Sequence, residues 1–202
     1  MDSLGYRSDP FTDLLFNILL GFTFLFLIAV MFINPVARLG NVQLKAEYII
    51  TVTWPDNTPD DLDIWVQDPH GNTLSYLNKD AGWLHLDRDD QGNVSDTVVI
   101  NGREVIYPIN QEVVTIRGIV AGEYTVNLYY YENRSNNPVQ ATVKIEKVNP
   151  SLKLVYIDQL QLVEQDEERT VLRFSLAGDG EFLGTNRNPK TLTPYALQAP
   201  TS

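Results

Sequence analysis

The first long hydrophobic run of the chain covers residues 14–33 and predicts a transmembrane helix. A helix of this length spans the ~30 Å hydrocarbon core of a bilayer. A cleaved signal peptide would instead have a basic start, a shorter apolar core and a small-residue cleavage site. Here the start is acidic and the run ends at Asn34-Pro35. We therefore expect a retained transmembrane helix at residues 11–34, preceded by a short segment at residues 1–10.

The pattern changes after residue 46, where short segments rich in β-branched and aromatic residues alternate apolar with polar positions. Turn sequences such as DPHGN and DDQGN separate these segments. Many short strands at this spacing are typical of an antiparallel sandwich. The predicted strands lie at residues 47–54, 62–68, 96–102, 112–118, 122–132 and 139–148.

Two further strand-like segments, LKLVYIDQLQLV and RTVLRFSLA, flank the acidic turn EQDEE and predict a closing hairpin. The last part of the chain lacks periodicity and predicts a flexible tail. The predicted fold class is thus a single N-terminal transmembrane α-helix followed by an all-β antiparallel sandwich. Its predicted parts after the helix are a connector at residues 35–46, the sandwich with its C-terminal hairpin at residues 47–184, and the tail at residues 185–202.

Composition narrows the classes of function. The net charge is −11, and the acidic residues lie mostly after Lys45, so the predicted sandwich would repel the phosphates of nucleic acids. The chain has no cysteine, which excludes disulfides, thiolate metal sites and a cysteine nucleophile. The two histidines, His70 and His85, belong to no recognisable acid, base or nucleophile pattern. We therefore expect neither nucleic-acid binding nor enzymatic activity.

Three polar or small residues share one face of the predicted helix. Asp13, Asn17 and Gly21 follow at spacings of four, which places them in one line along the helix. Small and amide-bearing residues permit close packing between helices in a bilayer. An ionised Asp at the bilayer centre costs about 2.5–3.5 kcal/mol on insertion scales, so such a residue is retained where it is paired, solvated or required. Asp13 lies at the apolar boundary, so hydration among lipid headgroups and a role in function are both open.

The stretch DPFTDLLFNILLGF resembles the N-terminal signature of the ion-driven motor subunits ExbD, TolR and MotB, in which a Pro, an apolar residue and a variable residue precede an Asp. The resemblance covers the helix region alone. It implies that Asp13 binds the translocated proton, and that two copies of the helix sit inside a ring of A-type subunits similar to MotA, TolQ or ExbB. Asn17 and Gly21 would then lie on the packing and ion-path face. Asn17 stands where the family is usually apolar, which leaves proton or sodium open as the coupling ion.

The same resemblance implies the orientation and location of the chain. Basic residues do not set the orientation, because Arg7 precedes the helix while Arg38 and Lys45 follow it. The family would place the N-terminus in the cytoplasm, the helix in the bacterial inner membrane and the sandwich in the periplasm or outside the cell. The alternative is a sandwich tethered by one helix for adhesion or ligand binding, without ion transport.

The stretch DDLDIWVQDPHGN, with the acidic segment that follows it, resembles YfaP-like bacterial β-sandwich domains. This likeness covers roughly residues 47–148. It implies a sandwich but no particular ligand, so the extracytoplasmic target of this domain stays unidentified.

Acidic residues of this region suggest a cation site. Asp61 and Asp63 are two apart and therefore share one face of a strand, and acidic residues of a later turn could approach them. Oxygen-rich clusters suit Ca²⁺, which takes six to eight oxygen ligands. The spacing is not that of an EF-hand, so solvated acidic loops are the alternative. The candidate calcium ligands are Asp61, Asp63, Asp87, Asp89 and Asp90.

Overall fold

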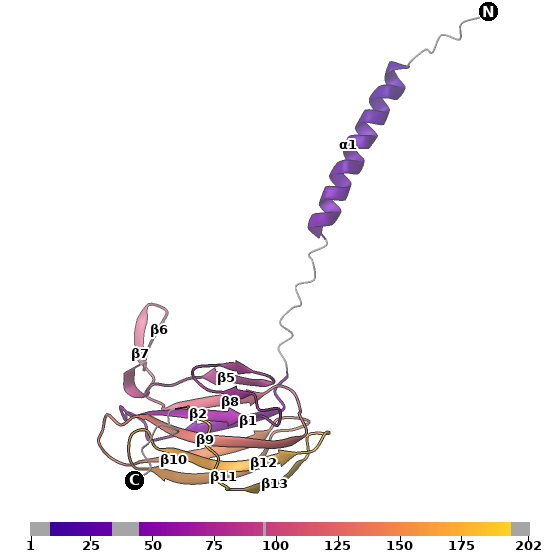
Figure 1. The fold of residues 1–202 in the computed structure, drawn as a ribbon. Coiled ribbons are helices and arrows are strands. Elements are labelled where there is room, and N and C mark those ends of the chain that lie inside the picture. Colours follow the sequence, from indigo (N-terminus) through magenta and orange to yellow (C-terminus); the bar gives the residue numbers. More distant parts are fainter. Residues whose placement is uncertain (1–8, 34–44, 95, 195–202) are drawn as a thin grey trace, which may run out of the picture. The chain divides into compact units, whose positions relative to one another are not determined.

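The structure is a computed structural model that describes residues 9–33, 45–94 and 96–194. The chain divides into two units, one up to Gln43 that contains the helix and one from Leu44 that contains the strands (Figure 1). Most of the expected connector at 35–46 lies outside the described residues.

The first unit is helix α1 (Pro10–Ile33), which is about 36 Å long at the usual helical rise. Asp9 caps it: its Oδ1 accepts the backbone N–H of Phe11 at 3.1 Å, and its Oδ2 accepts the hydroxyl of Thr12 at 2.9 Å. The helix is long and apolar enough to cross a membrane, and its side chains up to Val30 make no buried core within the unit. The predicted N-terminal helix is confirmed.

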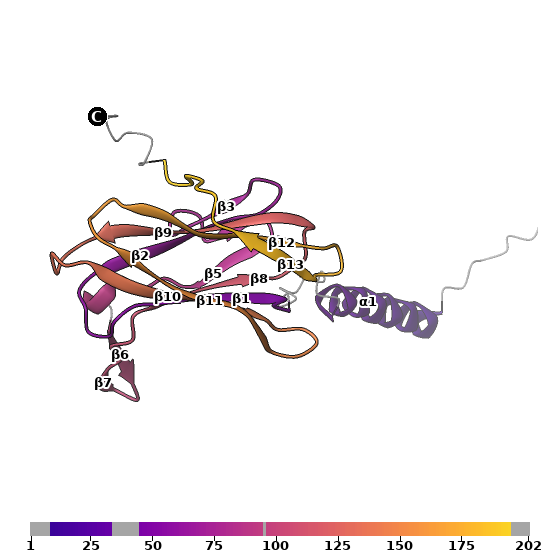
Figure 2. The same cartoon turned by 90° about the horizontal axis from the view of Figure 1, so that it is seen from below.

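The second unit is a sandwich of two antiparallel sheets, which Figure 2 shows as two layers. The larger sheet has the order β11-β10-β1-β8-β5-β4, and the smaller has the order β13-β12-β9-β2-β3. The strands of the larger sheet are β1 (Tyr48–Thr53), β4 (Asp80–Ala81), β5 (Leu84–Arg88), β8 (Gln111–Ile116), β10 (Val139–Lys147) and β11 (Lys153–Leu162). Those of the smaller sheet are β2 (Asp61–Gln67), β3 (Thr73–Leu74), β9 (Gly122–Glu132), β12 (Glu168–Leu176) and β13 (Phe182–Asn186).

The core fills the space between the sheets with alternate residues of each strand. Ile50 and Val52 of β1 are fully buried, as are Val126 and Leu128 of β9 and Phe174 of β12. This inward alternation is the pattern on which the prediction rested, and the predicted all-β sandwich is confirmed. The buried strand positions also include a few acidic residues, among them Asp61 and Asp63 of β2 and Glu112 of β8.

The predicted closing hairpin is not formed. Strands β11 and β12 follow each other in the chain, but β11 pairs with β10 in the larger sheet and β12 pairs with β9 and β13 in the smaller one. The acidic turn between them carries the chain from one layer to the other, and the carboxylate of Glu167 accepts the backbone N–H of Val163 there at 2.5 Å. Each strand forms its backbone hydrogen bonds with partners in its own sheet and buries apolar side chains in the shared core, which a local turn sequence does not reveal.

The expected tail is ordered over much of its length. Strand β13 extends to Asn186, and the following residues pack along β9 and β12. The carboxylate of Glu168 accepts the N–H of Leu192 at 2.7 Å and the hydroxyl of Thr193 at 2.9 Å, and the amide of Asn127 donates to the carbonyl of Lys190 at 2.6 Å. The ordered part of the sandwich therefore continues beyond the expected boundary at residue 184, and the expected tail after residue 194 lies outside the described residues.

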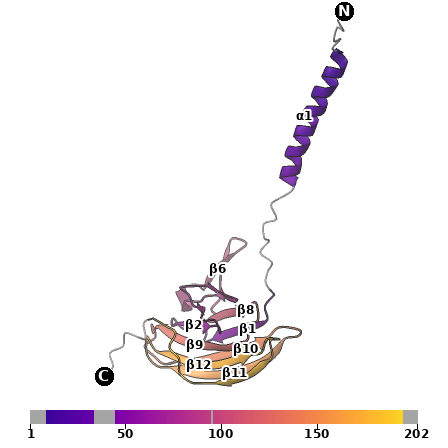
Figure 3. The same ribbon diagram turned by 45° about the vertical axis from the view of Figure 1, so that its right-hand side comes forward.

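A small hairpin projects from the sandwich (Figure 3). It consists of β6 (Thr97–Ile100) and β7 (Arg103–Ile106), follows the short 3₁₀ helix η1 (Gly92–Val94), and leads into β8. Asn101 and Gly102 form its two-residue loop with φ of 52° and 76°, the positive values that a type I′ turn requires. All eight strand residues are exposed, so the hairpin contributes nothing to the core.

Candidate functional site

The three residues singled out on the helix lie in regular helical geometry. The backbone N–H of Asp13 donates to the carbonyl of Asp9 at 3.1 Å, so Asp13 sits in the first turn of α1. Asn17 and Gly21 follow one and two turns later, and all three are exposed in the isolated unit. A methyl group built on Gly21 would meet no described atom within 4 Å. Nearly all described residues of the helix are exposed in the isolated unit, and on this face Gly21 has no side chain that would keep another helix at a distance.

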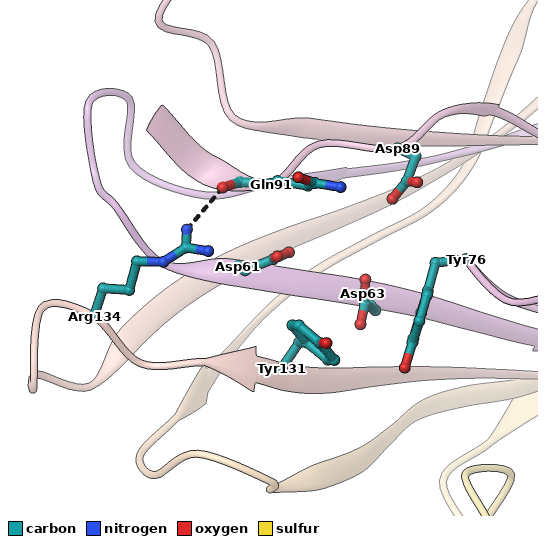
Figure 4. Close-up of a pocket in the computed structure, with 7 residues that line it drawn as sticks. All are labelled: Asp61, Asp63, Tyr76, Asp89, Gln91, Tyr131 and Arg134. Atoms are coloured by element: carbon teal, nitrogen blue, oxygen red, sulfur yellow. Dashed lines mark hydrogen bonds between the residues drawn. The ribbon is translucent and has the colours of Figure 1, made fainter. Parts of the chain in front are cut away.

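The sandwich carries a second candidate, an acidic pocket of about 200 Å³ (Figure 4). Its walls come from β2, from the ends of β5 and β9, and from the loop after β3. Two tyrosines close one side, and their rings meet edge to face with centroids 5.4 Å apart. The lining residues are Asp61, Asp63, Tyr76, Asp89, Gln91, Tyr131 and Arg134.

Three carboxylates converge at this pocket from both sheets. Oxygen atoms of Asp63, Asp89 and Glu112 all lie within 4.8 Å of one another. Asp63 belongs to β2 of the smaller sheet, whereas Glu112 belongs to β8 of the larger sheet. Strand β3 pairs only with the last two residues of β2, which leaves the earlier edge of β2 accessible to Glu112. There the Oε2 of Glu112 accepts the backbone N–H of Ile64 at 2.6 Å.

Several oxygens of this cluster are buried without a hydrogen bond. Asp61, Asp63 and Glu112 are 5%, 4% and 1% exposed. Among the described residues, Oδ1 of Asp61, Oδ2 of Asp63 and Oε1 of Glu112 have no hydrogen-bond partner. Buried polar atoms in folded proteins are nearly always satisfied, so three such atoms beside one pocket need an explanation.

Other buried aspartates of the same domain are well satisfied. Asp60 accepts the N–H and the hydroxyl of Ser135 at 2.9 and 2.8 Å. Asp68 accepts two backbone N–H groups and the Asn72 amide in its turn. Asp90 accepts from Arg88, Gly92 and Gln111. These three residues therefore hold loops in place. Among the described residues, the buried carboxylate oxygens without a hydrogen bond all belong to Asp61, Asp63 and Glu112, whereas the amide oxygens of Asn110 and Asn127 are unsatisfied elsewhere.

Burial and mutual repulsion make the pocket carboxylates hard to ionise. Burial raises the pKa of Asp61 to about 7, although the nearby guanidinium of Arg134 opposes this shift. Burial, with the charges of Asp61 and Asp89, raises the pKa of Asp63 to about 8. Burial and then the charge of Asp63 raise the pKa of Glu112 well above its usual value. The protein alone thus provides little compensation for these negative charges.

Two basic side chains lie beside the cluster: one pairs with Asp89 of the cluster, and the other is bonded mainly to groups outside it. Lys79 forms an ion pair with Asp89 at 2.6 Å from the exposed side. Arg134 donates to the carbonyls of Pro59 and Gln91 at 2.7 and 2.9 Å, the latter visible in Figure 4, and pairs with Glu132 at 2.6 Å. The pocket therefore keeps an excess of negative charge.

The structure brings together part of the calcium set expected from the sequence. Asp61, Asp63 and Asp89 meet at the pocket. Asp87 does not join them, because it points to the Arg117 guanidinium at 2.9 Å and lies 3.8 Å from His85. Asp90 does not join them either, since its oxygens are used by the loop bonds described above.

Glu112 was missed in the sequence, although a signal for it exists. In QEVVTI, Glu112 alternates with Val114 and Ile116, which face the core, so it is a charged residue at an inward position. Such a position is costly unless the charge is paired or binds a ligand.

Comparisons of the chain with protein-family models, with curated proteins and with solved structures return no match.

Proposed function

We propose that this protein is the B-type subunit of an ion-driven membrane motor, similar to ExbD, TolR and MotB. The observation that carries the proposal is the start of α1: a capped, mainly apolar helix with one carboxylate, Asp13, in its first turn. In this function Asp13 binds and releases the transported cation, and the sandwich transmits the resulting movement outside the cytoplasm.

Membrane energetics support a partner for this helix. A membrane-inserted carboxylate is retained mainly where protein or water accommodates it, and a lone helix offers neither within the bilayer. Asp13, Asn17 and the open side of Gly21 lie along one line. Small and amide-bearing residues in such a line permit close backbone approach and hydrogen bonds between helices. We therefore infer two copies of α1 packed inside a ring of multi-span A-type subunits, which complete the ion path.

The test uses the full chain expressed together with a multi-span A-type subunit, sought first in the neighbouring gene. We expect the two proteins to purify as one complex and to take up protons when reconstituted into vesicles with a proton gradient. Asp13→Asn should leave the complex intact and abolish uptake. Asp9→Asn is the matched control, because Asn caps helices as well as Asp does and the variant changes the same charge one turn earlier. Repeating the assay with a sodium gradient identifies the coupling ion.

The tethered-sandwich alternative predicts the opposite results. In that case no multi-span protein purifies with the chain, and Asp13→Asn behaves like Asp9→Asn in every assay. Such a result would leave the helix as an anchor and the sandwich as the functional part.

A further inference from the structure

We propose that Asp63, Asp89 and Glu112, with Asp61 beside them, form a Ca²⁺ site that joins the two sheets of the sandwich. This inference concerns the sandwich unit alone and does not depend on the motor proposal. It retains three of the residues expected from the sequence and replaces the other two with Glu112.

The unsatisfied oxygens are the first argument for a bound cation. Leaving a buried polar atom without a partner costs about 1–3 kcal/mol, and more when the group is charged. Three carboxylates at the pocket each contain such an atom, while Asp60, Asp68 and Asp90 of the same domain do not. Asp63 and Glu112, which hold two of these atoms, lie with Asp89 close enough together to share one cation, and the ion would also offset the charge of Asp61 beside them.

Charge is the second argument. Three carboxylates line the pocket and Glu112 lies beside them, whereas the basic groups at its rim are Lys79 and Arg134, of which Arg134 also pairs with Glu132. The acidic groups therefore outnumber the basic ones, and a divalent cation would offset this excess. Lys79 and Arg134 approach from the rim and are already bonded to Asp89, Glu132 and backbone carbonyls, so they do not fill the interior.

The chemistry of the donors selects calcium. Every candidate ligand is an oxygen, whereas zinc sites usually contain cysteine or histidine, and the chain has no cysteine. Oxygen atoms of Asp63, Asp89 and Glu112 lie within 4.8 Å of one another, which is close enough for all three to contact one Ca²⁺ at about 2.4 Å each. The side chain of Gln91 adds a neutral oxygen to the pocket. Mg²⁺ demands stricter octahedral geometry and usually keeps several waters, so a carboxylate cluster of this kind suits it less well.

The position of the site gives the ion a structural effect. Glu112 comes from the larger sheet, and Asp61 and Asp63 from the smaller, so the ion would cross-link the layers along the uncovered edge of β2. Glu112 pairs with Val52 near the end of β1, whereas Tyr48 at its start pairs with Ile116. The site thus lies toward the end of the sandwich away from the point where the chain enters β1.

The test is the thermal stability of the full chain, purified in detergent, stripped of metal and followed by tryptophan fluorescence. CaCl₂ at about 100 times the dissociation constant should raise Tm by roughly 5–10 °C for a domain of this size. MgCl₂ at the same concentration should raise it far less. Titration calorimetry with CaCl₂ should show one binding event per chain.

Three variants locate the site. Asp63→Asn and Glu112→Gln should lose the Ca²⁺ response, and in metal-free buffer they should melt at or above the wild-type temperature because each removes an uncompensated buried charge. A melting temperature at or above that of the wild type would show that a variant without the Ca²⁺ response is still folded and has lost only the binding of Ca²⁺. Asp87→Asn is the matched control and should keep the full response, since Asp87 pairs with Arg117 away from the pocket.

Several results would overturn the proposal. They are an unchanged Tm with no heat of binding, an equal response to Mg²⁺, a Glu112→Gln variant that responds as the wild type does, or an Asp87→Asn variant that loses the response.

Discussion

Glu112 of one sheet accepts the backbone N–H of Ile64 of the other, with 2.6 Å between Oε2 and N. This hydrogen bond closes the edge of β2 that β3 leaves uncovered, and it fixes the carboxylate of Glu112 beside Asp63. A single residue thus has two roles, as a bridge between the layers through one oxygen and as a candidate cation ligand through the other.

The first prediction separates these two roles. Glu112→Ala should be less stable than Glu112→Gln by about 1–3 kcal/mol in metal-free buffer, because only the glutamine keeps an acceptor for Ile64. The free energy of unfolding in urea measures the difference. Equal stability of the two variants would show that the hydrogen bond contributes nothing.

The second prediction concerns pH. Asp61, Asp63 and Glu112 have a higher pKa in the folded protein than in the unfolded chain. Above about pH 4 the folded state therefore keeps protons that the unfolded chain has already released. The free energy of unfolding in metal-free buffer should therefore fall between about pH 4 and pH 8, by up to about 1.4 kcal/mol per pH unit for each carboxyl. The guanidinium of Arg134 reduces the effect at Asp61 without reversing it.

The measurement is urea unfolding at several pH values, with and without Ca²⁺. Because ligands must be deprotonated to bind metal, the stabilisation by Ca²⁺ should grow over the same range. Asp63→Asn should show a shallower decline in metal-free buffer than the wild type. A wild-type protein that becomes more stable from pH 5 to pH 8 without metal would contradict this account.

The third prediction concerns the projecting hairpin. Val99 and Ile106 are 66% and 72% exposed, and no residue of β6 or β7 belongs to the core. The backbone N–H of Tyr107 donates to the carbonyl of Asp96 at 2.7 Å, so the two ends of the hairpin are already adjacent. Replacing residues 97–106 with a short Gly-Ser turn should change the free energy of unfolding by no more than about 0.5 kcal/mol. A larger loss would mean that the hairpin packs against another surface.

The fourth prediction concerns a buried tyrosine. The hydroxyl of Tyr124 accepts the backbone N–H of Val120 and donates to its carbonyl, both at 3.1 Å, while the ring stacks on Phe174. Tyr124→Phe keeps the stacking and leaves the Val120 groups unpaired, so it should cost about 1–3 kcal/mol. Tyr107→Phe, at an exposed position, is the control and should stay within about 0.5 kcal/mol of the wild type.

The sequence alone determined the features that depend on neighbouring residues. The helix follows from one long, mainly apolar run and from the Asp9-Pro10 start, and both signals are local. Most strands of the sandwich can be predicted from the alternation of apolar and polar residues. Successive side chains of a strand point to opposite faces of the sheet, and this does not depend on which strand is its partner. The same alternation predicts that Asp61 and Asp63 lie on one face of β2, because they are two residues apart.

Tertiary structure decided which distant segments meet. The EQDEE turn is compatible with a hairpin, yet β11 and β12 pair in different sheets because each finds its partners elsewhere in the chain. The segment at 187–194 has no period of its own and is ordered by bonds to Glu168 and Asn127. Glu112 lies far from Asp63 in the sequence, and only the packing of one sheet on the other brings their carboxylates together. Local patterns specify elements, whereas a site between two layers requires the layers to be assembled.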